Sequence, residues 1–430
     1  MPTTAVTPRQ HVLSNGLRVI TIELPHLHTV SLVMYAKVGS RYETPASNGL
    51  SHFVEHMLFR GTERYPDSYA LHLAIEDFGG TLYAETGRDY SLYQIAVHPE
   101  SVPSALEVLG EIFHRPRFPD VDLERKLVLE EMLEDRDEDG REINIDDISR
   151  AAVWPDHPLG FKITGPAGNV ERFAERDVRR HFQEFYGAAN MILCISGAAS
   201  EAEVLPLVQQ HFDGLHPGQA ATPLPPPEDQ HEARFVYVEN QGSQTSVQVL
   251  LRGVAEQDPD FTALTALGRI LDDGMSTRLH YRICDQLGLA YYCAANLEPL
   301  HDTALFEVDS TSAHAKVPAL LREQLALLTA LRDRPPTAAE LNKAKRRYRW
   351  DLEGTFDDPD SLAGWFGGTA LFYQPEGYAE KVRRMEAVTG EDIMRVARRI
   401  IQPARLTVAA VGVLDKGLDR EVEAIVRQFR

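Results

Sequence analysis

The segment SNGLSHFVEHMLFRGT, Ser47–Thr62, is the most informative stretch of this sequence. Its apolar residues repeat at i, i+3, i+4, i+7 and i+8, which predicts a helix with one buried face. His52, Glu55 and His56 fall nearly opposite the centre of that apolar stripe. Two imidazoles four residues apart on a helix can bind one zinc ion, and a carboxylate between them can act as a base. A histidine pair alone is typical of a solvated face, whereas the full HxxEH pattern with a distant carboxylate favours a metal site.

A catalytic zinc needs a third protein ligand and an open fourth position. The segment DVDLERKLVLEEMLEDRDED carries Glu124 and Glu131 seven residues apart, so both lie on one face of a predicted helix. Leu127 and Val128 flank that face, and a carboxylate among apolar residues is costly unless a cation or metal balances it. Either glutamate is therefore a candidate ligand, and at least one of them should have a cationic partner.

Length and composition exclude several classes of protein. The chain has 430 residues, 43% of them hydrophobic and 25% charged, as in a globular protein of two to four domains. Its 44 Lys and Arg against 64 Asp and Glu give a net charge of −20, which disfavours a nucleic-acid partner. No apolar run reaches the length of a membrane helix, and the first residues lack the apolar part of a signal peptide. We expect no membrane association and a cytoplasmic protein, or a periplasmic one if a signal peptide has been removed.

The three cysteines are odd in number and lack CxxC spacing, so we expect buried thiols and not a disulfide framework or a thiolate zinc site. The clearest break in composition is HPGQAATPLPPPEDQHEA, which has five prolines. It predicts a first domain at 1–215, a linker at 216–233 and a second domain at 234–430. Each half passes through strands, a long helix, more strands and paired helices, which indicates an internal duplication of an α+β unit. Two unrelated α+β domains are the alternative.

HFVEH followed by Glu131 resembles the inverted-motif zinc peptidases of the pitrilysin, insulysin and mitochondrial-processing-peptidase group, family M16. The resemblance is to the short two-domain type and covers nearly the whole chain. It implies two similar α/β-sandwich units, each a mixed, mostly antiparallel sheet packed with helices. The further motifs that carry it are Gly39–Glu43, Phe59–Thr62, Gly79-Gly80, Glu124–Glu131, His157–Gly160, Ser276–Leu279 and Gly288–Tyr291.

The resemblance also implies a role for each site residue. One Zn²⁺ per chain is expected, held by His52, His56 and Glu131, with Glu55 as general base and Glu124 orienting the site. An Arg and a Tyr of the second half contact the substrate backbone in this family, and Arg282 and Tyr291 in YRICDQLGLAYY fit those positions.

An edge strand pairs with the peptide in the family, and here it corresponds to Thr81, Leu82, Tyr83 and Ala84. Tyr83 departs from the pattern, because the family usually has Asn before Ala84, so the shape of a substrate subsite should differ.

By this resemblance the chain is a zinc metalloendopeptidase that hydrolyses peptides or unfolded segments inside a closed chamber. The alternatives are a non-catalytic or core subunit of a processing-peptidase-like complex and a peptidase dedicated to one precursor. A scaffold would have no physical need for a base beside two metal ligands. The expected partners are peptide substrates and a second subunit, in a homodimer or in a heterodimer with a related zinc-free chain.

Overall fold

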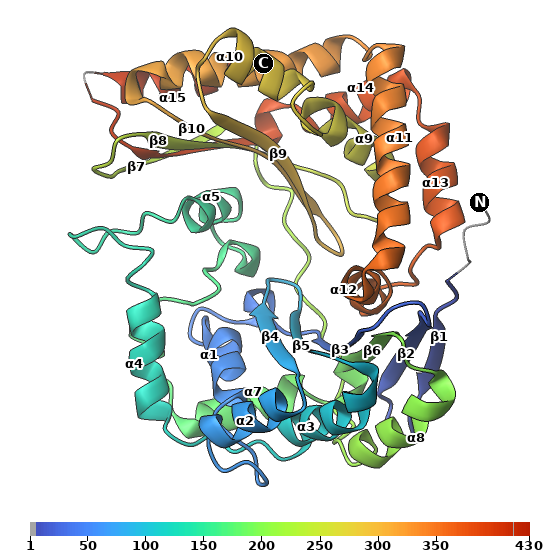
Figure 1. Cartoon of the computed structure of the whole chain (residues 1–430). Coiled ribbons are helices and arrows are strands. Elements are labelled where there is room, and N and C mark those ends of the chain that lie inside the picture. Colours follow the sequence, from blue (N-terminus) through green and yellow to red (C-terminus); the bar gives the residue numbers. More distant parts are fainter. Residues whose placement is uncertain (1–5, 416) are drawn as a thin grey trace. The chain divides into compact units, whose positions relative to one another are not determined.

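A computed structural model describes residues 6–415 and 417–430. Residue contacts divide the chain into two units (Figure 1). Unit 1 comprises the described part of Met1–Met132 together with Phe161–Leu224 and Leu352–Glu376. Unit 2 comprises Leu133–Gly160, Pro225–Asp351 and Gly377–Arg430. No helix in the described part of the chain is long and apolar enough to cross a membrane.

Unit 1 is built on a six-stranded sheet in the order β1-β2-β6-β3-β5-β4. The parallel pair β2 and β6 is joined to antiparallel neighbours on both sides. Residues of β3 alternate between two cores, Leu32 and Met34 facing one and Val33 and Tyr35 the other, which explains its unbroken apolar sequence. The strands are β1 (Arg9–Val12), β2 (Arg18–Glu23), β3 (Val30–Ala36), β4 (Thr81–Thr86), β5 (Ser91–Val97) and β6 (Met191–Gly197).

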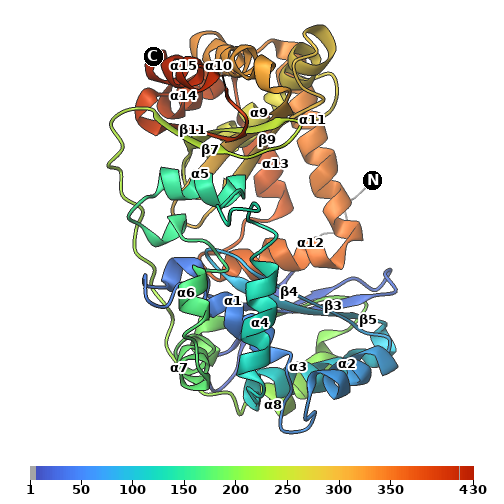
Figure 2. The ribbon, with the colours of Figure 1, turned by 90° about the vertical axis from the view of Figure 1, so that its left-hand side faces the viewer.

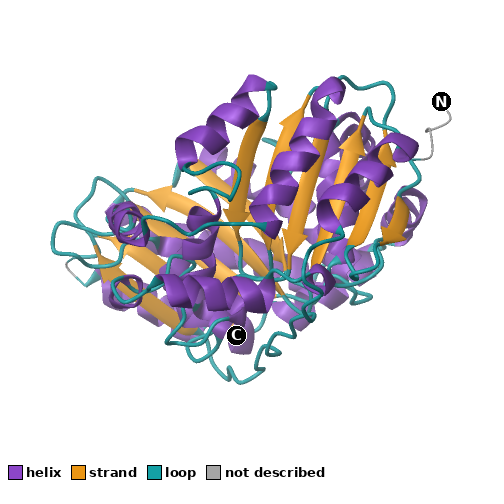
Figure 3. Cartoon of the chain, turned by 90° about the horizontal axis from the view of Figure 1, so that it is seen from below, coloured by secondary structure: helices purple, strands orange, loops and turns teal. Residues whose placement is uncertain are grey.

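Helices cover both faces of this sheet (Figure 3). Most of them pack on the larger core: α1 (Leu50–Leu58), α2 (Ser68–Asp77), α3 (Val102–His114), α4 (Val121–Glu131), α6 (Ala167–Val170), α7 (Glu175–Phe185) and α8 (Glu201–Phe212). On the other face, α12 (Pro359–Ala363) and the π-helix Gly364–Gly368 pack against β3 and β6. Leu362 and Phe366 meet Ile20, Ile22 and Cys194 there in a separate core.

Unit 2 has a five-stranded sheet in the order β7-β11-β8-β10-β9. Its strands are β7 (Arg234–Glu239), β8 (Thr245–Arg252), β9 (Tyr292–Pro299), β10 (Ala304–Ser312) and β11 (Leu406–Gly412). Its helices are α9 (Phe261–Leu271), the π-helix His280–Gln286, α10 (Val317–Asp333), α11 (Ala338–Gly354), α13 (Tyr378–Ala387), α14 (Gly390–Ile400) and α15 (Leu418–Gln428). The opposite face of the sheet is covered by α5 (Ile145–Val153), which packs on β7, β8 and β11 (Figure 2).

The two sheets repeat one topology. The order β2-β6-β3-β5-β4 corresponds to β7-β11-β8-β10-β9, and each sheet contains one parallel pair, β2 with β6 and β7 with β11. In each sheet the second strand of this order pairs antiparallel with the third, and the remaining neighbours are antiparallel as well. This correspondence confirms the predicted fold class of two similar α/β units.

The division into units differs from the predicted domains in two segments. The chain around α5 lies in unit 2 although it precedes residue 215, and the chain around α12 lies in unit 1 although it follows residue 234. Each segment belongs to the unit of the other sequence half because it covers an apolar face of that unit's sheet. Trp154, which follows α5, packs on Leu250 and Leu305 of unit 2. The proline-rich segment accepts hydrogen bonds from both units. Arg41 donates to the Leu224 carbonyl, and Arg252 donates to the Pro227 carbonyl.

Candidate metal centre

Helix α1 begins at a charged cap supplied from outside the helix. Gly49 at the N-cap has no side chain, and the buried Glu43 carboxylate accepts hydrogen bonds from the Gly49 N–H at 2.9 Å and the Ser51 N–H at 2.7 Å. These bonds satisfy amides that the helix itself leaves unpaired, and a negative charge is favourable at that end of the helix dipole. Glu43 therefore fixes where the helix starts.

The start of α1 is also clamped against a second segment of unit 1. Gly49 adopts a φ of +97°, and a Cβ there would lie 2.5 Å from the Thr164 carbonyl oxygen. Asn48 Nδ2 donates to the Lys162 carbonyl at 2.8 Å, and Asn169 Nδ2 donates to the Asn48 carbonyl at 3.0 Å. Only glycine fits this close backbone approach, so the position of the helix is set within narrow limits.

Two histidines of α1 face one carboxylate of α4. The Nε2 atoms of His52 and His56 each lie 3.5 Å from an oxygen of Glu131, the last residue of α4. The donor atoms of all three residues lie within 4.8 Å of one another. The structure thus brings together the three residues expected as ligands.

This set fits a zinc ion by spacing and by chemistry. Ligand atoms bound tetrahedrally at about 2.0–2.1 Å from zinc are roughly 3.3 Å apart, close to the observed histidine–carboxylate separations. Burial and the neighbouring His56 lower the pKa of His52 to about 3, so its imidazole is neutral, as metal ligation requires. Two imidazoles and one carboxylate are a donor set of catalytic zinc sites, which keep a fourth position open.

Glu124 orients one of the two imidazoles. It is buried on α4, and its Oε1 lies 2.8 Å from His56 Nδ1, leaving Nε2 of that ring toward Glu131. Burial alone would raise the pKa of Glu124, but hydrogen bonds from His56 and Arg60 lower it. Burial would likewise lower the pKa of His56, and the bond to Glu124 raises it. Arg60 supplies the cationic partner that we expected for one of the two glutamates.

Glu55 lies between the two histidines in sequence and points to a different partner. Thr86 Oγ1, at the end of β4, donates to Glu55 Oε2 at 2.5 Å. Burial raises the pKa of Glu55 although the Thr86 bond opposes this shift. A carboxylate with a raised pKa, next to metal ligands and held by one oxygen, is suited to accept and release a proton.

Strand β4, which contains Thr81–Ala84, is the edge of its sheet and pairs only with β5 among the strands of unit 1. Its side chains alternate: Leu82 and Ala84 pack on the core that includes α1, whereas Thr81 and Tyr83 are exposed. Its second edge therefore offers main-chain groups to an added strand.

Arg282 and Tyr291 both lie in unit 2. Arg282 lies on the π-helix His280–Gln286, where its Nε donates to Glu323 Oε2 of α10 at 3.0 Å. Tyr291 comes just before β9 and is 95% exposed. The π-helix that carries Arg282 packs against β9, which follows Tyr291 in the chain. Their roles stay predictions.

Three residues that contact the site, Glu43, Arg60 and Thr86, were not predicted as site residues from the sequence. Arg60 follows His56 by four residues, and this helical spacing could have identified it. Glu43 and Thr86 reach α1 through tertiary contacts, for which the sequence has no periodic signal. Leu127, expected on the buried face of α4, is 48% exposed, whereas Val128 is buried.

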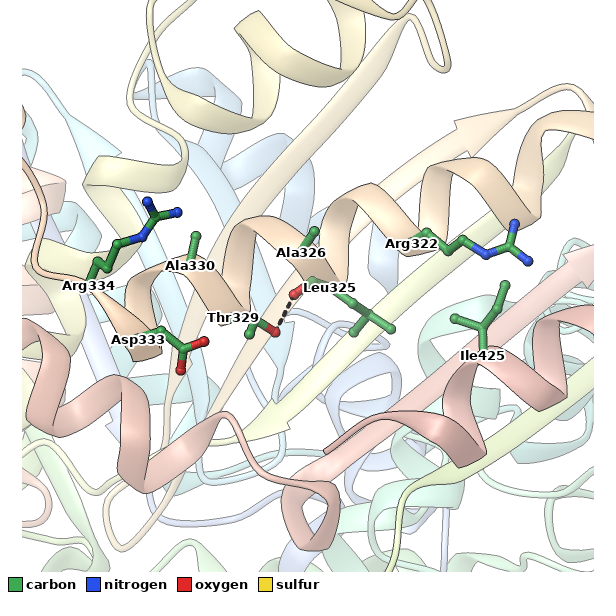
Figure 4. Close-up of a pocket in the computed structure, with 8 residues that line it drawn as sticks. All are labelled: Arg322, Leu325, Ala326, Thr329, Ala330, Asp333, Arg334 and Ile425. Atoms are coloured by element: carbon green, nitrogen blue, oxygen red, sulfur yellow. Dashed lines mark hydrogen bonds between the residues drawn. The ribbon is translucent and has the colours of Figure 1, made fainter.

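Unit 2 has a hollow of about 410 Å³ that lacks the histidine and glutamate cluster of the candidate metal centre. It lies along α10 beside Ile425 of α15 and mixes Arg322, Arg334 and Asp333 with small side chains (Figure 4). Thr329 donates to the Leu325 carbonyl of the same helix at 2.7 Å. None of the predicted site residues lines it.

Comparison with known proteins identifies the family of this chain. The family described as "Insulinase (Peptidase family M16)" matches residues 18–167, and "Peptidase M16 inactive domain" matches residues 172–348. An uncharacterized zinc protease of Streptomyces coelicolor is 27% identical over 97% of this chain and 93% of its own length. A probable mitochondrial-processing peptidase subunit beta of Schizosaccharomyces pombe is 28% identical over 95% of this chain and 92% of its own.

A solved structure titled as a protease from Helicobacter pylori has the same fold, with a TM-score of 0.89 at 23% identity. The matched region covers 95% of this chain and 100% of the Helicobacter chain. The family match and the zinc-protease relatives support zinc as the cofactor and a protease as the class. The chain belongs to peptidase family M16, in its short two-domain form.

Proposed function

We propose that this chain is a zinc-dependent endopeptidase that cleaves peptides or unfolded segments of proteins. The observation that supports this most directly is the convergence of His52, His56 and Glu131 beside a carboxylate held by Thr86. A site that only stabilised the fold would close its fourth position with another protein ligand and would not need this base.

His52, His56 and Glu131 would hold one zinc ion per chain. Zinc in such a site supplies Lewis-acid polarisation of the scissile carbonyl. Glu55 would accept the proton of the attacking water at the carboxylate oxygen that Thr86 leaves free and pass it to the leaving amine. Glu124 would keep the His56 ring in the orientation that presents Nε2.

The free edge of β4 would bind the peptide in an extended form through the main chain of Thr81, Leu82, Tyr83 and Ala84. Main-chain pairing favours peptides and unfolded segments, because a folded protein has few extended strands to offer. Arg282 and Tyr291 would hold the carbonyl of the peptide near the cleaved bond. We further propose that substrates are enclosed in a chamber, so that stably folded proteins are spared.

Besides peptide substrates, the proposed partner of this chain is a related subunit. The zinc unit of one chain would work with Arg282 and Tyr291 of another, in a homodimer with two sites or a heterodimer with a zinc-free relative. The match to mitochondrial-processing peptidase subunits beta supports a dimer of related chains.

Metal analysis combined with a mixed peptide library tests the proposal. The purified protein should contain about one zinc per chain and cleave short peptides. Glu55→Gln should keep the zinc and lose about 100-fold or more in kcat, because it removes proton transfer without removing a ligand. Glu76→Gln, an exposed acid of α2, is the matched control and should leave both unchanged. A zinc-loaded wild-type protein that cleaves no peptide of the library would contradict the proposal.

A further inference from the structure

The side of β4 that points away from α1 carries a pair of side chains that the mechanism above does not use. Tyr83 and Glu85 lie two residues apart on this edge strand, so they share one face of the sheet. Tyr83 is 52% exposed, and its hydroxyl donates to Glu85 Oε2 at 2.9 Å. The tyrosine thus fixes the direction of an exposed carboxylate on the strand that ends at Thr86.

The two faces of β4 offer different chemistry. Thr86 and Ala84 turn toward the core that includes α1, where Thr86 bonds to Glu55. Tyr83 and Glu85 turn the other way, beside Gln94 and Leu92, their direct partners on β5. A peptide lying along β4 would therefore place alternate side chains on the reacting face and on the Tyr83–Glu85 face.

Among the described residues, no cationic side chain balances the charge of Glu85. Across residues 6–415 and 417–430, no Lys or Arg side chain forms an ion pair with Glu85, and its one hydrogen-bond donor is the neutral Tyr83 hydroxyl. Other exposed acids of this unit, such as Asp122, do have an arginine partner. An oriented carboxylate beside an exposed aromatic ring is a suitable binding place for an incoming cation.

We propose that Tyr83 and Glu85 form a subsite that selects a lysine or arginine side chain of the substrate close to the cleaved bond. This inference rests on the proposed peptidase function. Because Thr86 holds the base Glu55, the substrate residue opposite Thr86 lies nearest the reacting atoms. The next residue along the peptide lies opposite Glu85 and points to its carboxylate. Opposite charges directly across a strand pair attract, and the ring of Tyr83 adds a cation–π contact.

Peptides that differ in a single residue test the subsite. The varied residue is placed in turn at each of the two positions before and the two positions after the cleaved bond. With Lys, Gln or Glu in that place, the wild-type protein should show kcat/KM about three- to tenfold higher for Lys than for Gln at one of these positions. Glu85→Gln should bring this ratio close to one. Glu85→Lys should invert it in favour of Glu, which loss of structure alone would not do.

Glu76→Gln removes one charge from the same unit and should keep the wild-type ratio, which separates the subsite from general attraction by the acidic chain. A Lys-to-Gln ratio that is the same in Glu85→Gln and wild type would overturn the proposal. Binding of the same peptides to Glu55→Gln, measured by fluorescence anisotropy, gives a second readout. Peptides that bind with the Lys preference but that the zinc-loaded wild type never cleaves would refute the peptidase and leave the subsite standing. Binding without that preference would refute the subsite.

Discussion

Replacing Glu124 with Gln should weaken zinc binding without removing a ligand. In the wild type the two carboxylate oxygens serve two donors, His56 Nδ1–H and Arg60 Nε–H. A Gln side chain has a single acceptor oxygen, so one of these donors would face an NH₂ group in a buried place. Hydrogen bonds to charged groups contribute about 1.5–3 kcal/mol each, and loss of one would free the His56 ring to rotate.

The expected loss in zinc affinity is about 10- to 100-fold, as for other partners of metal-bound histidines. This corresponds to roughly 1.4–2.7 kcal/mol of binding free energy. Competition against a chromophoric chelator of known affinity measures it directly, with circular dichroism to verify the fold. Glu130→Gln, an exposed neighbour on the same helix, is the matched control. Wild-type zinc affinity in Glu124→Gln, alongside loss of zinc in Glu131→Ala, would refute a role for Glu124 through His56.

Three further outcomes are expected. Gly49→Ala should lower the free energy of unfolding by about 2–4 kcal/mol in urea titrations, because its Cβ would lie 2.5 Å from the Thr164 oxygen at a φ of +97°. Gly79→Ala, with a φ of +72° and open space around the new Cβ, should lose only about 1 kcal/mol, and equal losses would contradict the clamp. Burial raises the pKa of Glu307 from 4.5 to about 7 against the opposing charge of Arg150. The folded state then binds a proton that the unfolded chain has released, so the free energy of unfolding should fall as pH rises from 4.5 to 7. Glu307→Gln should flatten that part of the stability curve, and an unchanged slope would show that Glu307 does not titrate there. Mixing Glu55→Gln chains with Arg282→Ala chains should restore activity if sites form between subunits, since one site of the mixed dimer then carries neither change. No recovery despite proven subunit exchange would rule out such shared sites.

Periodicity in the sequence identified the helix of the site and its orientation. The apolar stripe around Phe53 and Met57 is buried in the structure, as the periodicity predicted. Spacing left Glu124 and Glu131 both open as the third ligand, and the structure brings Glu131, which the family resemblance favoured, to His52 and His56. The expectation that a buried glutamate of α4 needs a cation was confirmed by Arg60. These predictions were accessible because each depends on positions within one or two helices.

Contacts between distant segments could not be predicted in this way. The caps and bonds from Glu43 and Thr86 join α1 to residues outside the helix, and no periodic pattern marks them. Leu127 fits the apolar pattern of α4 and is nevertheless exposed, because which helix faces find a neighbour depends on the packing of the whole unit. The exchange of α5 and α12 was missed for the same reason, since a short amphipathic helix does not specify which sheet it covers.

The exchange of α12 has a consequence for the synthesis of the chain. A protein emerges from the ribosome N-terminus first, and domains usually fold as soon as they are complete. Unit 1 cannot be complete at that stage, because the sheet face formed by Ile20, Ile22 and Cys194 is covered by residues 359–368. That apolar face therefore stays exposed to solvent until most of the polypeptide has been synthesised. We therefore expect nascent chains that stop near residue 215 to bind chaperones or aggregate, and the segment 352–376, supplied as a separate peptide, to rescue them.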